Sequence, residues 1–134
     1  MIILKVSLVR ARYPSVWEPT NLMYISAFIK DRYNGNLDVQ ILDGFFDSDE
    51  QILNKITGSD YVGFSGTTPQ VPHIKKLSKL VKKEYPSMKT VAGGYGPSLQ
   101  PFLFLDDSSI DYLIVGEGEQ SMLDILNGVA TQKL

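Results

Sequence analysis

The sequence contains no cysteine, and this absence excludes several kinds of site at once. Without a thiol, the chain forms neither a disulfide nor a thiolate zinc site, and it has no cysteine ligand for an iron–sulfur cluster. Histidine occurs once, as His73. Chemistry that needs a cluster bound by thiolates must therefore come from outside this sequence.

The sequence also lacks a long apolar run and a strong excess of charge. No stretch approaches the ~20 apolar residues that span a bilayer, and residues 1–5 have no basic segment ahead of their apolar residues. Five lysines within residues 75–83 are typical of a solvated helix face. The net charge of −2 gives no general reason to expect nucleic acid. We therefore expect a cytoplasmic protein with no signal peptide, no membrane contact and no nucleic-acid ligand.

Length and composition predict a single domain over residues 1–134. A chain of 134 residues buries roughly two thirds of the surface that its unfolded form exposes, which is enough for one core. Hydrophobic residues make up 43% of the sequence and charged residues 21%, as in an ordinary globular protein.

Strand and helix patterns alternate along the whole chain. The predicted strands cover residues 2–9, 37–42, 61–64, 88–92 and 111–115, and the predicted helices cover approximately 20–34, 48–58, 69–85, 99–105 and 120–126. We expect Thr20 or Asn21 to cap the first helix, and Ser48 with Gln51 to form a capping box at the second.

This alternation predicts an α/β fold with a doubly wound, five-stranded parallel sheet. Residues 37–42 alternate between apolar and polar side chains, the pattern of a half-exposed strand near a sheet edge. The flavodoxin-like (Rossmann-like) strand order 2-1-3-4-5 places this second strand at the edge, and we therefore predict that order.

Two loops at the ends of neighbouring predicted strands carry small and polar residues. The third strand ends in Ser65, Gly66, Thr67 and Thr68, and the fourth ends in a glycine-rich loop at 93–96. Because the carboxyl ends of parallel strands share one edge of the sheet, hydroxyl groups and bare backbone would line a single crevice.

The first loop, residues 10–19, lacks the residues that several well-known protein classes with this architecture need there. A phospho-receiver domain needs acidic residues there and an aspartate after the third strand, where Arg10, Arg12 and Ser65 stand instead. A dinucleotide fold needs a glycine-rich first turn, and this loop has no glycine. A flavin mononucleotide site needs more hydroxyl groups than Ser15 and Thr20 supply.

Four segments together resemble the cobalamin-binding domains, and most closely those fused to radical S-adenosylmethionine enzymes. The segments are residues 60–69 (DYVGFSGTTP), 91–97 (VAGGYGP), 19–28 (PTNLMYISAF) and 111–119 (DYLIVGEGE). Their order and spacing are more specific than any one of them. The resemblance covers essentially the whole chain.

This resemblance implies that the nucleotide tail of cobalamin lies in the crevice, with the corrin ring over the strand ends. Residues 65 and 67 would hydrogen-bond the tail, and the glycine pair at 93 and 94 would leave it room. Aromatic side chains would cover the corrin. The full set of cofactor-binding residues implied is Trp17, Ser65, Gly66, Thr67, Thr68, Gly93, Gly94, Tyr95, Gly116 and Glu117.

The first loop departs from many cobalamin domains, because it contains neither Asp-x-His-x-x-Gly nor any histidine. The resemblance therefore implies a cobalt without an imidazole from the protein, and no metal ligand in this chain. By the same resemblance, the chain is a module cut from a longer radical S-adenosylmethionine enzyme of the methyltransferase or cyclase type. The iron–sulfur cluster and S-adenosylmethionine would belong to a downstream barrel, in cis or in trans, and we expect no catalysis by this chain alone.

Purely structural explanations are open for the same residues. Ser65, Thr67 and Thr68 are typical caps of a following helix, and a glycine pair is typical of a turn with positive φ. A loop aromatic such as Trp17 commonly anchors its loop, and Glu117 is favoured by the dipole of the next helix. A cofactor-free interaction domain docking on a partner barrel and a small-molecule sensor domain are thus the alternative functions.

Overall fold

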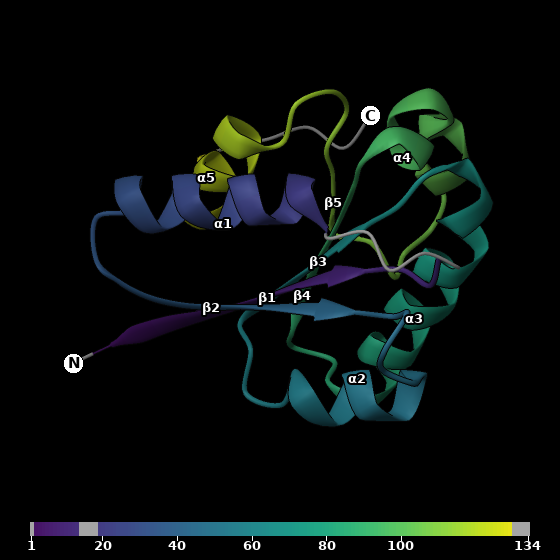
Figure 1. Ribbon diagram of the computed structural model, residues 1–134, viewed down its shortest axis with the longest axis horizontal. Helices are drawn as coiled ribbons and strands as arrows, with labels where there is room; N and C mark the ends of the chain where they lie inside the picture. Colours follow the sequence, from purple (N-terminus) through teal and green to yellow (C-terminus); the bar gives the residue numbers. More distant parts are fainter. Residues whose placement is uncertain (1, 14–18, 130–134) are drawn as a thin grey trace.

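The computed structural model describes residues 2–13 and 19–129, and the described residues form a parallel five-stranded sheet flanked by helices (Figure 1). The strand order is β2-β1-β3-β4-β5, which confirms the predicted flavodoxin-like topology. The strands are β1 (Ile3–Arg10), β2 (Asn36–Asp43), β3 (Tyr61–Ser65), β4 (Lys89–Gly93) and β5 (Tyr112–Leu113). The helices are α1 (Thr20–Arg32), α2 (Asp49–Lys55), α3 (Val71–Glu84), α4 (Tyr95–Leu99) and α5 (Glu119–Leu126), with 3-10 turns η1 (Thr68–Gln70) and η2 (Pro101–Phe104).

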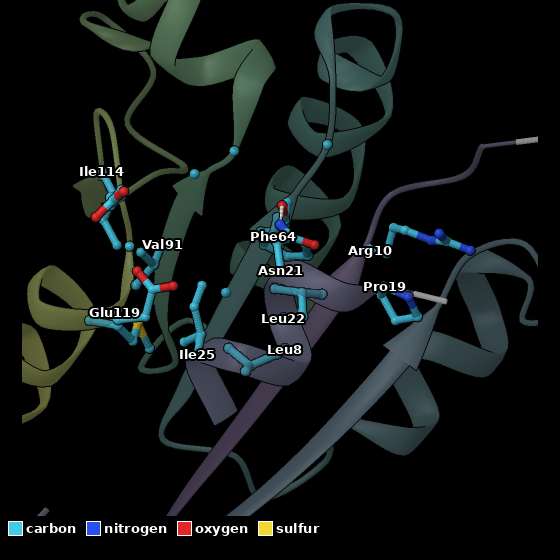
Figure 2. A pocket seen from close by; sticks show the side chains of 18 of the residues that line it. Leu8, Arg10, Pro19, Asn21, Leu22, Ile25, Phe64, Val91, Ile114 and Glu119 are labelled. Carbon is cyan, nitrogen blue, oxygen red and sulfur yellow. Dashed lines mark hydrogen bonds between the residues drawn. The ribbon is translucent and has the colours of Figure 1, made fainter. Parts of the chain in front are cut away.

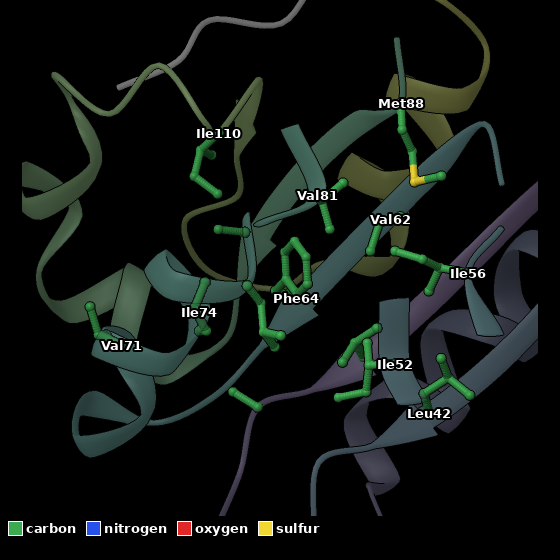
Figure 3. Packing of buried hydrophobic residues seen from close by; sticks show 14 of the residues in the cluster. Leu42, Ile52, Ile56, Val62, Phe64, Val71, Ile74, Val81, Met88 and Ile110 are labelled. Atoms are coloured by element: carbon green, nitrogen blue, oxygen red, sulfur yellow. The ribbon is translucent and has the colours of Figure 1, made fainter. Parts of the chain in front are cut away.

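The helices cover the sheet on both faces and divide the core in two. Helices α2 and α3 pack on one face, where Ile52, Phe64 and Ile74 are fully or almost fully buried (Figure 3). Helices α1 and α5 lie together on the other face (Figure 1), where Leu8 and Met122 belong to the second core. Each of these four helices therefore buries its apolar side against strands that have residues in both cores.

Alternation along β3 decides which of its residues face each core. Val62 and Phe64 belong to the core beneath α2 and α3, so Gly63 and Ser65 face α1 and α5. Parallel pairing sets Gly63 between Leu8 of β1 and Val91 of β4. This central row of the sheet is the floor of the site described below.

Some helix boundaries and caps match those predicted from the sequence, and others do not. The Ser48 and Gln51 capping box opens α2 as predicted. Helix α1 begins after Pro19 without a side-chain cap, so the expectation that residue 20 or 21 caps it is wrong. Helix α4 starts at Tyr95, four residues before the predicted start at residue 99, because Gly94 turns the chain at the strand end. Among the described helices, none is long and apolar enough to cross a membrane.

Candidate functional site

A cleft of about 1140 Å³ opens between α1, α5 and the carboxyl ends of β3 and β4 (Figure 2). Pockets for drug-sized ligands usually have about 300–1,000 Å³, so this cleft suits a larger ligand. Its floor and inner walls are apolar and its mouth is polar. The apolar lining includes Leu8, Leu22, Ile25, Phe28, Val91, Ile114 and Met122.

Gly94 at the mouth is required by the fold itself. Its φ is +97°, a conformation that side chains disfavour, and a Cβ on it would lie 2.8 Å from Ser65 Oγ and 2.9 Å from the Gly66 carbonyl oxygen. The open explanation of Gly94 as a turn glycine therefore holds. A substitution at Gly94 would disturb the loops as well as any ligand.

Gly93, unlike Gly94, is not required by the backbone conformation or by close neighbouring atoms. Its φ is not positive, and a Cβ would make only ordinary contact with Ile114, at 3.5 Å from Ile114 Cβ. It pairs with Ser65 across β3 and β4 and lines the cleft. The space in front of Gly93 is therefore cleft space, and a larger side chain there would enter it.

Ser65 is buried at the mouth and is held by a residue that the sequence did not identify. The Asn21 side-chain amide donates to Ser65 Oγ at 2.7 Å, which joins the first turn of α1 to the end of β3. Both residues line the cleft. Asparagine at the start of a helix is typical of a cap. The sequence therefore suggested a capping role for Asn21 and not its hydrogen bond to Ser65.

Thr67 has a structural role in addition to its place in the cleft. Its backbone N–H and its hydroxyl both donate to Gln70 Oε1, at 2.7 and 2.9 Å. The Gln70 amide in turn donates to the Ala11 carbonyl oxygen at 2.6 Å, so the loop after β3 is tied to the segment after β1. Thr68 is exposed and lies outside the cleft lining.

The remaining predicted residues lie around the rim or outside the described structure. Tyr95 is 75% exposed at the start of α4, and both Gly116 and Glu117 line the cleft in the segment after β5. Trp17 lies outside the described residues.

His73 belongs to a polar cluster outside the cleft. Its Nδ1 accepts from the Arg12 backbone N–H at 2.7 Å, and its Nε2 is 2.7 Å from Asp49 Oδ1. Asp49 also contacts the Arg12 guanidinium and the Lys76 ammonium, at 3.0 and 3.2 Å. Burial raises the pKa of the Asp49 carboxyl, but hydrogen bonds from His73 and Lys76 outweigh it, and the pKa lies below its ordinary value. Both ring nitrogens of His73 are thus engaged.

Comparison with known proteins gives a family for this arrangement. A family model described as B12 binding domain matches residues 6–126. An anaerobic magnesium-protoporphyrin IX monomethyl ester cyclase from Rubrivivax gelatinosus is 30% identical over 118 residues, which cover 84% of this chain and 21% of the cyclase.

Solved structures share the fold. The radical S-adenosylmethionine methyltransferase TsrM from Kitasatospora setae, with tryptophan substrate and an S-adenosylmethionine analogue bound, aligns over 93% of this chain and 25% of its own, with a TM-score of 0.78 and 20% identity. A cobalamin-binding protein from Desulfitobacterium hafniense aligns over 96% of this chain and 59% of its own, with a TM-score of 0.66 and 12% identity. The chain spans only 21% of the cyclase and 25% of the methyltransferase.

Proposed function

This chain belongs to the B12-binding domain family, and on that premise we propose that it binds cobalamin in the cleft and presents it to a radical S-adenosylmethionine catalytic domain. One observation carries the proposal. Eight residues implied by the resemblance come from three separate loops and line this one cleft: Ser65, Gly66, Thr67, Gly93, Gly94, Tyr95, Gly116 and Glu117.

The cleft fits the parts of cobalamin that it would hold. An apolar floor suits the base of the nucleotide tail, and the polar mouth suits the sugar and phosphate that follow it. Ser65 would hydrogen-bond the tail while Asn21 holds its hydroxyl in place at 2.7 Å. Gly93 would leave the tail room, and Tyr95 and Glu117 stand at the rim where the corrin ring would lie.

In this proposal the cobalt takes no imidazole from the protein. His73 is the only histidine in the sequence, and its ring nitrogens contact Arg12 and Asp49 outside the cleft. When bound, cobalamin supplies the cobalt chemistry used in methyl transfer or ring formation. The role of this chain is to hold the tail, exclude water from it and orient the cofactor toward a partner.

The partner is inferred from the longer relatives. TsrM is a radical S-adenosylmethionine methyltransferase and the Rubrivivax protein is a cyclase, and this chain matches about a quarter or less of each. Because the chain has no cysteine, the iron–sulfur cluster and S-adenosylmethionine would be bound by a partner barrel, in cis or in trans.

Titration of the purified chain with hydroxocobalamin tests the proposal. We expect a shift in the corrin absorption spectrum and a calorimetric binding heat. Gly93→Leu should remove both, because its side chain enters the cleft from a position with ordinary φ. Ala27→Leu, which adds bulk on the exposed side of α1, is the matched control and should bind normally.

Two outcomes would contradict this proposal. If the folded wild-type chain gives no spectral shift and no heat, cobalamin binding is wrong and the cofactor-free docking domain becomes the better interpretation. If the wild-type chain binds and Gly93→Leu binds equally well, the cofactor lies elsewhere on the molecule.

A further inference from the structure

The segment that forms α4 and η2 is unusual in its composition. Residues 95–105, which contain both elements, include no charged residue. Each of the helices α1, α2, α3 and α5 carries Asp, Glu, Lys or Arg. Surface helices normally direct charged and polar side chains toward solvent. Contact with water alone therefore does not explain the composition of this segment.

The outward side of the segment is apolar. Tyr95 and Leu99 stand one turn apart on the same side of α4, and Leu99 is 68% exposed. Phe102 follows in η2 and is 63% exposed. We call this surface the α4–η2 ridge, and its members are the large apolar residues of the segment that are exposed: Tyr95, Leu99, Phe102, Leu103 and Leu105. Exposed apolar patches of several side chains commonly mark an interaction site.

The inward side of the same segment already fixes it to the rest of the fold. Phe104 is fully buried in the core beneath α2 and α3. A Cβ on Gly96 would lie 2.6 Å from the Thr67 carbonyl oxygen and 2.7 Å from Val71 Cγ2, so α4 packs closely against the start of α3. The exposed side chains are therefore not needed to hold the segment, and the fold presents them on a fixed support.

The α4–η2 ridge adjoins the mouth of the cleft. Helix α4 follows directly on β4, at the carboxyl end of that strand (Figure 1). Tyr95 and Ser98 both line the cleft. Ser98 Oγ accepts a hydrogen bond from the Gly116 backbone N–H at 3.0 Å, which ties α4 to the segment after β5. A protein that covers the mouth would therefore lie against the ridge as well.

The area of the ridge limits the kind of partner that it fits. Its exposed side chains present roughly 500 Å² of apolar surface, at about 200 Å² for a whole aromatic side chain and less for leucine. A stable protein–protein interface buries about 800 Å² on each partner. A stable partner must therefore extend beyond the ridge, and the adjoining mouth supplies the additional surface.

The position of the ridge favours a catalytic domain over a second copy of this chain. A second copy that covered both the ridge and the mouth would separate the cofactor from the domain that uses it. A catalytic domain that uses cobalamin must itself lie over the mouth. An apolar support beside the mouth would hold that domain in its working position.

We propose that the α4–η2 ridge is the docking surface for the catalytic domain, which packs an uncharged apolar strip against Leu99 and Phe102 while its reaction centre faces the mouth of the cleft. This inference rests on the proposed function. Leu99 and Phe102 lie outside the cleft lining, so docking and cofactor binding can be changed separately.

Site-specific photo-crosslinking in the cells that carry this gene tests the docking surface. The photoreactive analogue benzoylphenylalanine replaces Leu99 or Phe102 in the complete gene product. The same analogue at Ile2, which is 90% exposed ahead of β1, is the control. We expect mass spectrometry to identify cross-links from positions 99 and 102 to peptides of a radical S-adenosylmethionine domain, in cis or in trans, and none of these from position 2.

A charge variant measures the contribution of the apolar contact. With the analogue at position 102, Leu99→Asp should lower the yield of this cross-link by about tenfold or more, because it buries an unpaired charge at the interface. Ile2→Asp makes the same kind of change away from the ridge and should leave the yield unchanged. The purified Leu99→Asp chain should bind hydroxocobalamin as wild type does, and circular dichroism checks that it is folded.

The outcomes separate this inference from the proposed function. Cross-links from the ridge to a second copy of this chain, or no more cross-linking than from position 2, overturn the docking surface. An unchanged yield in Leu99→Asp also overturns it. Loss of cobalamin binding in the folded Leu99→Asp chain does so too, because the ridge would then belong to the cofactor site. A wild-type chain that binds no cobalamin overturns the proposed function.

Discussion

Asp49 shows at the scale of a single residue how the segment after β1 is held beside the sheet. Its carboxylate contacts His73, Arg12 and Lys76, and these contacts lower its pKa below the ordinary value of 3.8 despite burial. A carboxyl with a lowered folded-state pKa stabilises the fold fully above its unfolded pKa, and it loses this contribution as the pH falls through the folded value. The contribution should therefore be present above about pH 4 and be lost progressively as the pH falls below that value.

We expect Asp49→Asn to be less stable than wild type near neutral pH and to lose less stability on acidification. Urea denaturation at a series of pH values between about 7 and 3 measures this difference as the change in the free energy of unfolding. Asp31→Asn, at a carboxylate whose side chain is 82% exposed, is the control and should follow wild type. Parallel pH curves for wild type and Asp49→Asn would show that ionisation of Asp49 contributes no pH-dependent stability.

Some site residues were predictable individually and others were not. Ser65 and Gly93 are marked by an abrupt change from apolar to small or polar residues at a strand end. Asn21 contacts Ser65 across 44 positions of sequence, and only the placement of α1 over the sheet brings the two together. The position of Gly63 between Leu8 and Val91 depends on the registers of β1 and β4 together.

At the scale of elements, helices α1 and α5 enclose the cleft on one face of the sheet. Both line the cleft, whereas α2 and α3 pack on the opposite face of the sheet. A ligand that fills the cleft would connect α1 and α5 to the floor, and binding to the closed form suppresses local opening.

Hydrogen exchange followed by mass spectrometry tests whether cobalamin binds on the face of the sheet that carries α1 and α5. Bound cobalamin should slow amide exchange in α1, in α5 and in the loops after β3 and β4, and leave α2 and α3 unchanged. Gly93→Leu with the same concentration of cobalamin should show no such change. Slower exchange confined to α2 and α3 would place the ligand on the other face.

The boundaries of elements were predictable where local chemistry sets them. The capping box of α2 lies at the expected residues, and β2 takes the edge position that its alternating pattern indicates. Helix α4 was placed too late because its first turn is Tyr95, Gly96 and Pro97, a composition typical of a loop. Strand β5 is shorter than predicted, with residues 112–113 alone in the ladder, because it is an edge strand that pairs only with β4.

The whole molecule should unfold as one unit, because the two cores share the same strands. Leu8 and Val9 are neighbours in β1, yet they belong to opposite cores, so loss of either core removes support from the sheet. We expect a single thermal transition. Cobalamin at about 100 times its Kd should add about 2.7 kcal/mol of stability and raise Tm by several degrees.

Differential scanning calorimetry measures both effects. Gly93→Leu should show no rise in Tm with cobalamin, because its side chain enters the cleft. Two separate transitions in the free chain would show that the α1 and α5 side melts independently, which contradicts the single unit.

Three of the glycines that line the cleft should have different evolutionary fates. Gly94 has positive φ and touches Ser65 and Gly66, so a lineage that abandoned the cofactor would still be under selection to keep it. Gly63 and Gly93 carry no such demand from the backbone, and in that lineage both would drift toward residues that fill the cleft. Retention of Gly94 in a homologue therefore says little about cofactor use, whereas glycine at both 63 and 93 identifies a descendant that still depends on its ligand.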